Sequence, residues 1–476
     1  MPRRTAVVLS LCVALMAIPG LLSAYMLWSG IYQINPALDE WFRDAVPVLG
    51  GDWVVVGTIG SNLPTVPPEI RITRIDETGA VLWDKHVTGD PQHPDFGNYA
   101  RGVAASPDGG CVTVAEIVVA GGIGDVDVLV TKWSSNGTVQ WHRLIGMVGR
   151  EYQFYIAPAK FGGYVVAGIS ILDDVYVLNL FKLSEDGTPE WQKQFGDEDD
   201  AISIQGYSSL EATADGGCVI LAWVNHTTAL TQYNLVVKLG IDGSVEWMRE
   251  IGEDDQIGSP NYLSSVSQDP TGGYILVGQF VSSDTRLWLL RLHGSGIIDW
   301  QKTLTEGGFA RGFGAVGIDD GYLVTGIAAG NNWFVRTYLD GAIRWVRSYD
   351  FAAGPTLATD IVLGPGETFV ATGRDYRSTG GWFLRAPISS GIVPPPGCPV
   401  SDTNYTEDLS VDNIAEFVST IPVDSGSMDI DYSPAVTVSN LTANRQIDCS
   451  EVNDEEFVMG DDFEGGDFDG WSDVFE

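Results

Sequence analysis

The last acidic stretch of this chain holds the residues with the clearest potential for chemistry. Asp461, Asp462, Asp467 and Asp469 lie close together and are spaced by glycine, phenylalanine and one glutamate. Calcium takes about six to eight oxygen ligands, which flexible carboxylates can supply. The spacing makes these four residues candidate calcium ligands; we expect no cofactor, with calcium as the one open possibility. The same stretch is also typical of a sorting tail, or of the start of a further module.

Signatures of enzymes are missing from the sequence. It has no Gly-x-Ser-x-Gly elbow, no His-Glu-x-x-His pair and no Gly-x-x-x-x-Gly-Lys phosphate loop. The histidines are scattered along the chain, at His86, His93, His142, His226 and His293. The net charge of −37 excludes a nucleic-acid partner, because phosphate recognition needs clustered lysine and arginine.

These absences favour a binding or scaffold module for a protein or a glycan over an enzyme. Two alternatives stay open. One is a calcium-dependent surface adhesin. The other is an enzyme with its site in a central funnel, which would be a lyase, a hydrolase or a quinone-dependent oxidoreductase.

The cysteines fall into two kinds. Cys111 and Cys218 each follow a Gly-Gly pair and are expected to be small core residues. Cys398 and Cys449 lie in the acidic C-terminal part, where residues 397–476 hold 20 acidic residues and one basic residue. In an oxidising compartment these two are expected to form a disulfide.

The N-terminus reads as an export segment. Residues 1–28 combine a basic start with a long apolar run, and Leu22-Ser23-Ala24 could be cleaved by a signal peptidase. An uncleaved anchor is the alternative, because about 20 apolar residues span a bilayer. Either way we expect a secreted or cell-surface protein that is a monomer and touches a membrane only through this segment.

A repeat of about 50 residues dominates the rest of the chain. Each unit starts with Gly-Gly or a close variant and a short apolar run. The seven starts are at Gly50, Gly109, Gly162, Gly216, Gly272, Asp320 and Gly366. A later strand of the unit carries tryptophan, and the six copies are Trp83, Trp141, Trp191, Trp247, Trp300 and Trp345.

The repeat predicts an all-β fold. The apolar runs are too short for helices and suit strands buried on both faces, and Asp-Gly pairs favour hairpin turns. Such sheets must bury their faces on one another, so we expect a β-propeller over residues 40–390, with seven four-stranded blades. The seventh unit is incomplete, and Asp44 to Leu49 is expected to supply its outer strand. A proline-rich linker (391–397), a small disulfide-closed β segment (398–450) and an acidic, partly disordered tail (451–476) follow.

The motif of glycine, a spacer and tryptophan, as in Gly187-Thr188-Pro189-Glu190-Trp191, resembles the quinoprotein-like (PQQ-like) β-propeller repeat over roughly residues 50–390. The resemblance implies the propeller fold. Catalytic members of that group use calcium, a quinone and often an adjacent cysteine pair. This chain has no adjacent cysteines, so the resemblance implies its secreted, non-catalytic branch.

Overall fold

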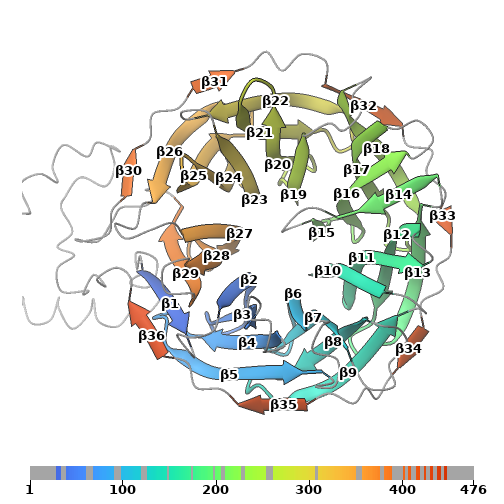
Figure 1. The fold of residues 1–476 in the computed structure, drawn as a ribbon, viewed down its shortest axis with the longest axis vertical. Helices are drawn as coiled ribbons and strands as arrows, with labels where there is room; N and C mark the ends of the chain where they lie inside the picture. Colours follow the sequence, from blue (N-terminus) through green and yellow to red (C-terminus); the bar gives the residue numbers. More distant parts are fainter. Residues whose placement is uncertain are drawn as a thin grey trace, which may run out of the picture.

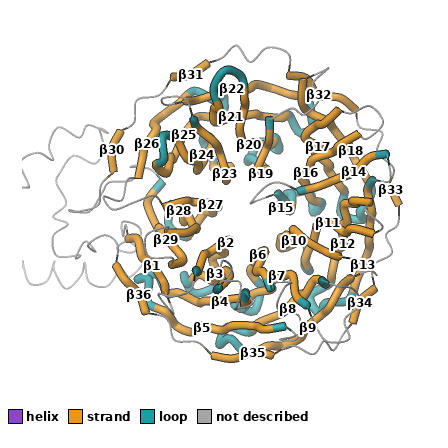
Figure 2. Tube along the Cα trace, viewed as in Figure 1, coloured by secondary structure: helices purple, strands orange, loops and turns teal. Residues whose placement is uncertain are grey.

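The computed structural model holds β-strands joined by loops and turns, and no helix, in the residues that it describes (Figure 2). These residues are 28–33, 39–60, 68–89, 98–118, 126–146, 150–172, 175–196, 199–204, 209–226, 231–253, 261–305, 309–349, 356–375, 380–388 and seven short strands between 400 and 447. Within them, no helix has the length and apolar character needed to cross a bilayer.

Seven sheets stand around a common axis, which confirms the predicted seven-bladed propeller (Figure 1). Blade 1 holds β2 (Glu40–Pro47), β3 (Trp53–Ile59), β4 (Glu69–Ile75) and β5 (Val81–Thr88). Blade 2 holds β6 (Tyr99–Ala105), β7 (Cys111–Ile117), β8 (Asp127–Trp133) and β9 (Val139–Gly146). Blade 3 holds β10 (Arg150–Pro158), β11 (Tyr164–Leu172), β12 (Val175–Leu183) and β13 (Pro189–Phe195).

The remaining blades follow the same antiparallel order. Blade 4 holds β14 (Asp200–Ser203), β15 (Leu210–Ala212), β16 (Cys218–His226), β17 (Thr231–Leu239) and β18 (Val245–Glu253); β14 and β15 share its inner position. Blade 5 holds β19 (Tyr262–Gln268), β20 (Tyr274–Val281), β21 (Thr285–Leu292) and β22 (Ile298–Thr305). Blade 6 holds β23 (Ala310–Ile318), β24 (Gly321–Ala328), β25 (Asn331–Tyr338) and β26 (Ile343–Tyr349). Blade 7 holds β27 (Thr356–Gly364), β28 (Thr368–Asp375), β29 (Gly380–Pro387) and β1 (Trp28–Gln33).

The core is divided among the interfaces between blades. Seven hydrophobic clusters are each shared by two neighbouring blades, and the predicted core positions Cys111 and Cys218 lie fully buried in two of them. This arrangement follows from the apolar runs, because each sheet can bury both faces only against its neighbours.

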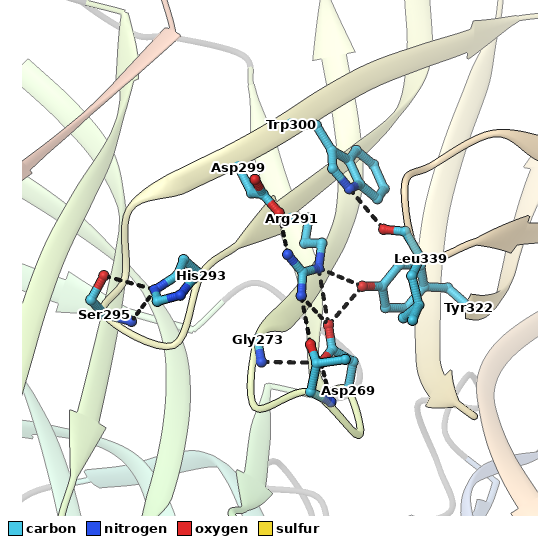
Figure 3. A network of polar contacts seen from close by, with 10 residues as sticks. Asp269, Gly273, Arg291, His293, Ser295, Asp299, Trp300, Tyr322 and Leu339 are labelled. Atoms are coloured by element: carbon cyan, nitrogen blue, oxygen red, sulfur yellow. Dashed lines mark hydrogen bonds and ion pairs between the residues drawn. The ribbon is translucent and has the colours of Figure 1, made fainter. Parts of the chain in front are cut away.

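Five of the six repeat tryptophans, all except Trp345, donate a hydrogen bond to a turn of the next blade. The Trp247 ring covers Gly296 in the turn of the following blade, and its indole N–H donates to the carbonyl of Gly294 at 3.0 Å. Trp300 donates in the same way to the carbonyl of Leu339, also at 3.0 Å (Figure 3). The repeat signature of glycine followed by tryptophan therefore encodes contacts between blades.

The prediction for the strand that completes blade 7 was wrong. Residues from Asp44 onward belong to β2, the innermost strand of blade 1, and the outer strand of blade 7 is β1. Phe42 and Ala45 of β2 are buried against blade 7, which suits an inner strand. β1 is in turn attached to blade 1, because the Tyr32 hydroxyl donates to the carbonyl of Gly79 at 2.8 Å.

Residues 398–450 have the predicted β character, but their strands join the blades instead of forming a separate sheet. They are β30 (Val400–Asp402), β31 (Thr406–Asp408), β32 (Ile414–Val418), β33 (Val423–Asp424), β34 (Asp429–Asp431), β35 (Thr437–Asn440) and β36 (Asn444–Ile447). Each one pairs with the outer strand of a different blade. We call this segment the belt, and Figure 1 shows its strands around the rim of the ring.

Candidate binding site at the inner strands

The residues singled out from the sequence do not form one site. Asp461, Asp462, Asp467 and Asp469 lie outside the described residues, as do Cys398 and Cys449. Within the part of the chain that the structure describes, no three His, Cys, Asp or Glu side chains are grouped for a metal ion. The histidines are dispersed as expected: His86 pairs with Glu69 in blade 1, and His226 pairs with Glu250 in blade 4.

A network of polar contacts holds blades 5 and 6 together. Arg291 in blade 5 bonds to Asp269 and to the Tyr322 hydroxyl of blade 6, the latter at 2.7 Å, and it also pairs with Asp299 (Figure 3). Lys132 contacts the Tyr164 hydroxyl at 3.2 Å between blades 2 and 3. Because the same contact recurs at equivalent strand positions, we interpret it as part of the fold and not as a ligand site.

The inner strands carry a second, less regular group of polar residues. A β-bulge interrupts the pairing of β2 between Phe42 and Asp44, so Arg43 is the extra residue, and a bulge in β6 does the same for Arg101. β23 bulges between Gly312 and Gly314, next to Arg311. Bulges re-aim side chains and are common beside functional sites.

These three arginines, together with Arg374 in β28, the second strand of blade 7, lie over aromatic rings on consecutive blades. Arg311 of blade 6 lies 5.2 Å from the ring centre of Phe313, and Arg374 of blade 7 lies 5.7 Å from that of Trp41. Arg101 of blade 2 lies 5.4 Å from Tyr99, and Arg43 of blade 1 lies 6.0 Å from Tyr155. We call these four arginines and their rings the axial cluster.

The contact of Arg43 shows on which side of the blades this arginine and Tyr155 lie. Its Nη2 donates to the hydroxyl of Tyr155 at 3.2 Å. Arg43 belongs to blade 1 and Tyr155 to blade 3, with β6 of blade 2 between them. The two side chains therefore meet on the axis side of β6, where the inner strands surround the middle of the ring (Figure 1).

The arginines of the axial cluster differ in their ion pairs. Arg101 pairs with Glu116 at 2.6 Å, and Arg374 pairs with Asp39 at 2.5 Å. Arg311 is half-buried and has no carboxylate partner among the described residues. An arginine without a carboxylate is notable in a chain with 63 acidic and 26 basic residues.

A pair of carboxyl groups lies beside the cluster. Asp44 of blade 1 and Asp360 of blade 7 are close enough to influence each other's ionisation, and burial raises the pKa of Asp44 to about 6. Burial and the neighbouring Asp44 also raise the pKa of Asp360 well above its ordinary value. Asp44 accepts a hydrogen bond from the backbone N–H of Val103 at 2.8 Å. Ser265 makes the equivalent contact with Ala315 of the next blade at 3.2 Å, so we interpret Asp44 as a connector of blades.

This pair predicts that stability depends on pH. The folded Asp44 carboxyl has a pKa near 6 against 3.8 for the free group, so the folded state holds more protons between these pH values, and stability falls as pH rises through this window. Asp44→Asn keeps an acceptor for Val103 and removes the ionisation. We expect the variant to exceed the wild type in unfolding free energy by about 3 kcal/mol at pH 8 and to match it near pH 4. Urea unfolding at both pH values checks this; an equal difference at both would contradict it.

The sequence could have pointed to part of the axial cluster. Arg43 lies seven residues before the Gly-Gly start at Gly50, and Arg101 lies eight residues before the start at Gly109. A basic residue at nearly the same position of two repeats is a signal in a chain that has few basic residues. The pairing of Arg43 with Tyr155 could not be predicted, because it depends on which side chains meet across blade 2.

Comparison with known proteins finds relatives only among solved structures. No family model and no curated protein matches the chain. The polysaccharide lyase Uly1 is 12% identical, with a TM-score of 0.48, covering 73% of this chain and 90% of the lyase. The β-propeller domain of the Trilobed protease from Pyrococcus furiosus, of open velcro topology, is 12% identical, with a TM-score of 0.41, covering 73% of this chain and 93% of that domain.

The α-L-arabinanase of Penicillium chrysogenum, solved with arabinobiose, is 11% identical, with a TM-score of 0.39, covering 60% of this chain and 92% of the enzyme. These likenesses concern the propeller fold alone. The chain is thus a seven-bladed β-propeller, and its resemblance to the quinoprotein-like group stays a prediction from the repeat.

Proposed function

We propose that this protein is an exported binding module whose axial cluster recognises an acidic glycan. The observation that carries the proposal is the row of arginines over aromatic rings on blades 6, 7, 1 and 2, of which Arg311 has no carboxylate partner in the described part of the chain. Export to the surface or the medium is supported by the basic and apolar residues 1–28.

The chemistry of these residues suits a sugar acid. A guanidinium can bind a carboxylate or sulfate through two parallel hydrogen bonds. Aromatic rings offer flat apolar surface with a polar edge, against which the C–H face of a sugar ring can lie. A neutral glycan would leave the charge of Arg311 without a partner, and burial of an unpaired charge is costly.

Arg311→Gln is expected to weaken the binding of an acidic polysaccharide at least about tenfold, because a hydrogen bond to a charged group contributes about 1.5–3 kcal/mol. The measurement is calorimetric titration of the full chain with oligogalacturonate, with dextran oligomers as the neutral ligand. Arg344→Gln is the control, since Arg344 lies in the outer strand of the same blade and pairs with Asp320 at 3.2 Å.

Three results would count against the proposal. They are absence of binding to oligogalacturonate and to sulfated oligosaccharides alike, equal affinity for dextran, and equal losses in the two variants. Thermal unfolding of both variants shows whether a loss of affinity reflects a loss of structure.

The same incubations test the enzyme alternative. New reducing ends in the glycan would favour a hydrolase, and an unsaturated product absorbing in the ultraviolet would favour a lyase. The calcium-dependent adhesin remains a proposal that rests on the sequence of the C-terminal tail. Its ligands would be the four aspartates from Asp461 to Asp469.

A further inference from the structure

The belt pairs with every blade once, in the reverse of the order in which the blades follow one another along the chain. β30 pairs with β26 of blade 6, and the next five strands pair with blades 5, 4, 3, 2 and 1 in turn. The last strand, β36, pairs with β1 of blade 7. The belt therefore runs around the whole ring against the direction of the propeller chain, as its strands in Figure 1 show.

All seven belt strands run in the same sense relative to the ring. Each is antiparallel to its outer strand, and its first residue faces the last residues of that strand. Val400 opposes Tyr349, the end of β26, and Asn444 opposes Gln33, the end of β1. Every belt strand thus starts at one face of the propeller and ends at the other. A link from one belt strand to the next therefore has to join opposite faces of neighbouring blades, and we call such a link a crossing.

Six such crossings are made by the peptide chain. They comprise residues 403–405, 409–413, 419–422, 425–428, 432–436 and 441–443, so each has between three and five residues. One crossing is left over. It runs from the end of β36 on blade 7 to the start of β30 on blade 6, and these blades are neighbours, with β23 and β24 packed against β27.

The two C-terminal cysteines flank this remaining crossing in sequence. Cys449 follows Ile447, the last residue of β36, by two positions, and Cys398 precedes Val400, the first residue of β30, by two positions. Residues 448, 449, 398 and 399 would supply four residues, within the range of the other crossings. A disulfide joins Cα atoms about 5–6 Å apart, little more than a peptide unit.

We infer that a disulfide between Cys398 and Cys449 makes the seventh crossing and turns the belt into a covalent hoop around the propeller. The two thiols lose two protons and two electrons to an external disulfide, either a small molecule or a protein oxidant, which is reduced to two thiols. The hoop would hold a fifth strand on every blade and keep the outer edges of β5, β9, β13, β18, β22, β26 and β1 covered.

The pairing is tested on the full chain, purified without reductant after export or after oxidation with glutathione disulfide. The protein is then digested without reduction. We expect a linked peptide that contains Cys398 and Cys449, which separates into two on reduction. Cys111 and Cys218, which are buried thiols, should react with iodoacetamide only after unfolding. Alkylation of Cys398 and Cys449 in the oxidised native protein, or a link to another cysteine, would overturn the inference.

The hoop itself is tested with the single variants Cys398→Ser and Cys449→Ser and the double variant. If the two thiols are joined, the midpoint of thermal unfolding falls by the same amount, on the order of 5 °C, in all three variants. Adding reductant to the wild type should lower its midpoint to the same temperature. Hydrogen exchange should quicken in all seven belt strands together, because opening any crossing frees the whole belt. Exchange that quickens only beside residues 398 and 449, or variant effects that add, would contradict the hoop.

Discussion

Arg71→Met is expected to lower the free energy of unfolding by about 3–5 kcal/mol, because it leaves two carboxylates buried without their cation. The Arg71 guanidinium lies 2.9 Å from Glu40 and 2.8 Å from Asp84, and all three side chains are about 1% exposed. It also donates to the backbone carbonyl of Tyr32 at 3.1 Å. Arg71 therefore joins the closing strand β1 to blade 1, and its loss weakens the contact between blades 7 and 1.

Urea unfolding of the wild type and the variant measures this effect. Arg344→Gln is the matched control, since its ion pair with Asp320 is exposed and should contribute at most about 1 kcal/mol. Adding Glu40→Gln and Asp84→Asn to Arg71→Met should recover part of the loss, because no unpaired charge then remains buried. A loss for Arg71→Met no larger than the control's would show that β1 is not held in this way.

Gly296→Ala is expected to destabilise by about 2–4 kcal/mol, more than Gly272→Ala at about 1 kcal/mol. The two glycines have nearly the same backbone, with φ of 82° and 84°, where a side chain is strained. They differ in their surroundings. A Cβ at Gly296 would lie 2.8 Å from the Trp247 ring, whereas a Cβ at Gly272 meets nothing within 4 Å.

The difference between these two variants isolates the docking of tryptophan on the next blade. Both are measured by urea unfolding, with Trp247→Ala as a third variant that removes the ring. In the Trp247→Ala background, Gly296→Ala should cost no more than Gly272→Ala. Equal costs in the wild-type background would mean that the tryptophan contact contributes little to the seam between blades 4 and 5.

The repeat was enough to predict the ring, because each unit carries its own strand and turn signals. Gly-Gly starts and Asp-Gly turns set the strand ends, and the apolar runs could be buried only between sheets. The closing strand was misplaced for a physical reason. Asp44 to Leu49 directly precedes a Gly-Gly start, as every inner strand does, whereas Trp28–Gln33 continues an apolar segment that reads as part of an export signal.

The β character of residues 398–450 was predicted, but the pairing of the belt strands with the blades could not be, because these strands are short, acidic and of weak periodicity. Val423–Asp424 has two residues, and Asp429–Asp431 has two aspartates around one isoleucine. Such strands are defined by the outer edges that they cover and not by their own pattern. The axial cluster was missed for a related reason: the bulges that place Arg43 and Arg101 interrupt the alternation that sequence reasoning uses.

Hydrogen exchange of the oxidised full chain, read by mass spectrometry, tests most directly the central claim that both chain ends seal one ring. The account predicts that residues 28–33 and the belt strands between 400 and 447 exchange at least about tenfold more slowly than the same sequences in free synthetic peptides. It also predicts that a chain ending at residue 397 exchanges faster in the outer strands of the blades. Belt strands that exchange as fast as the free peptide, with outer strands unaffected by the truncation, would contradict it.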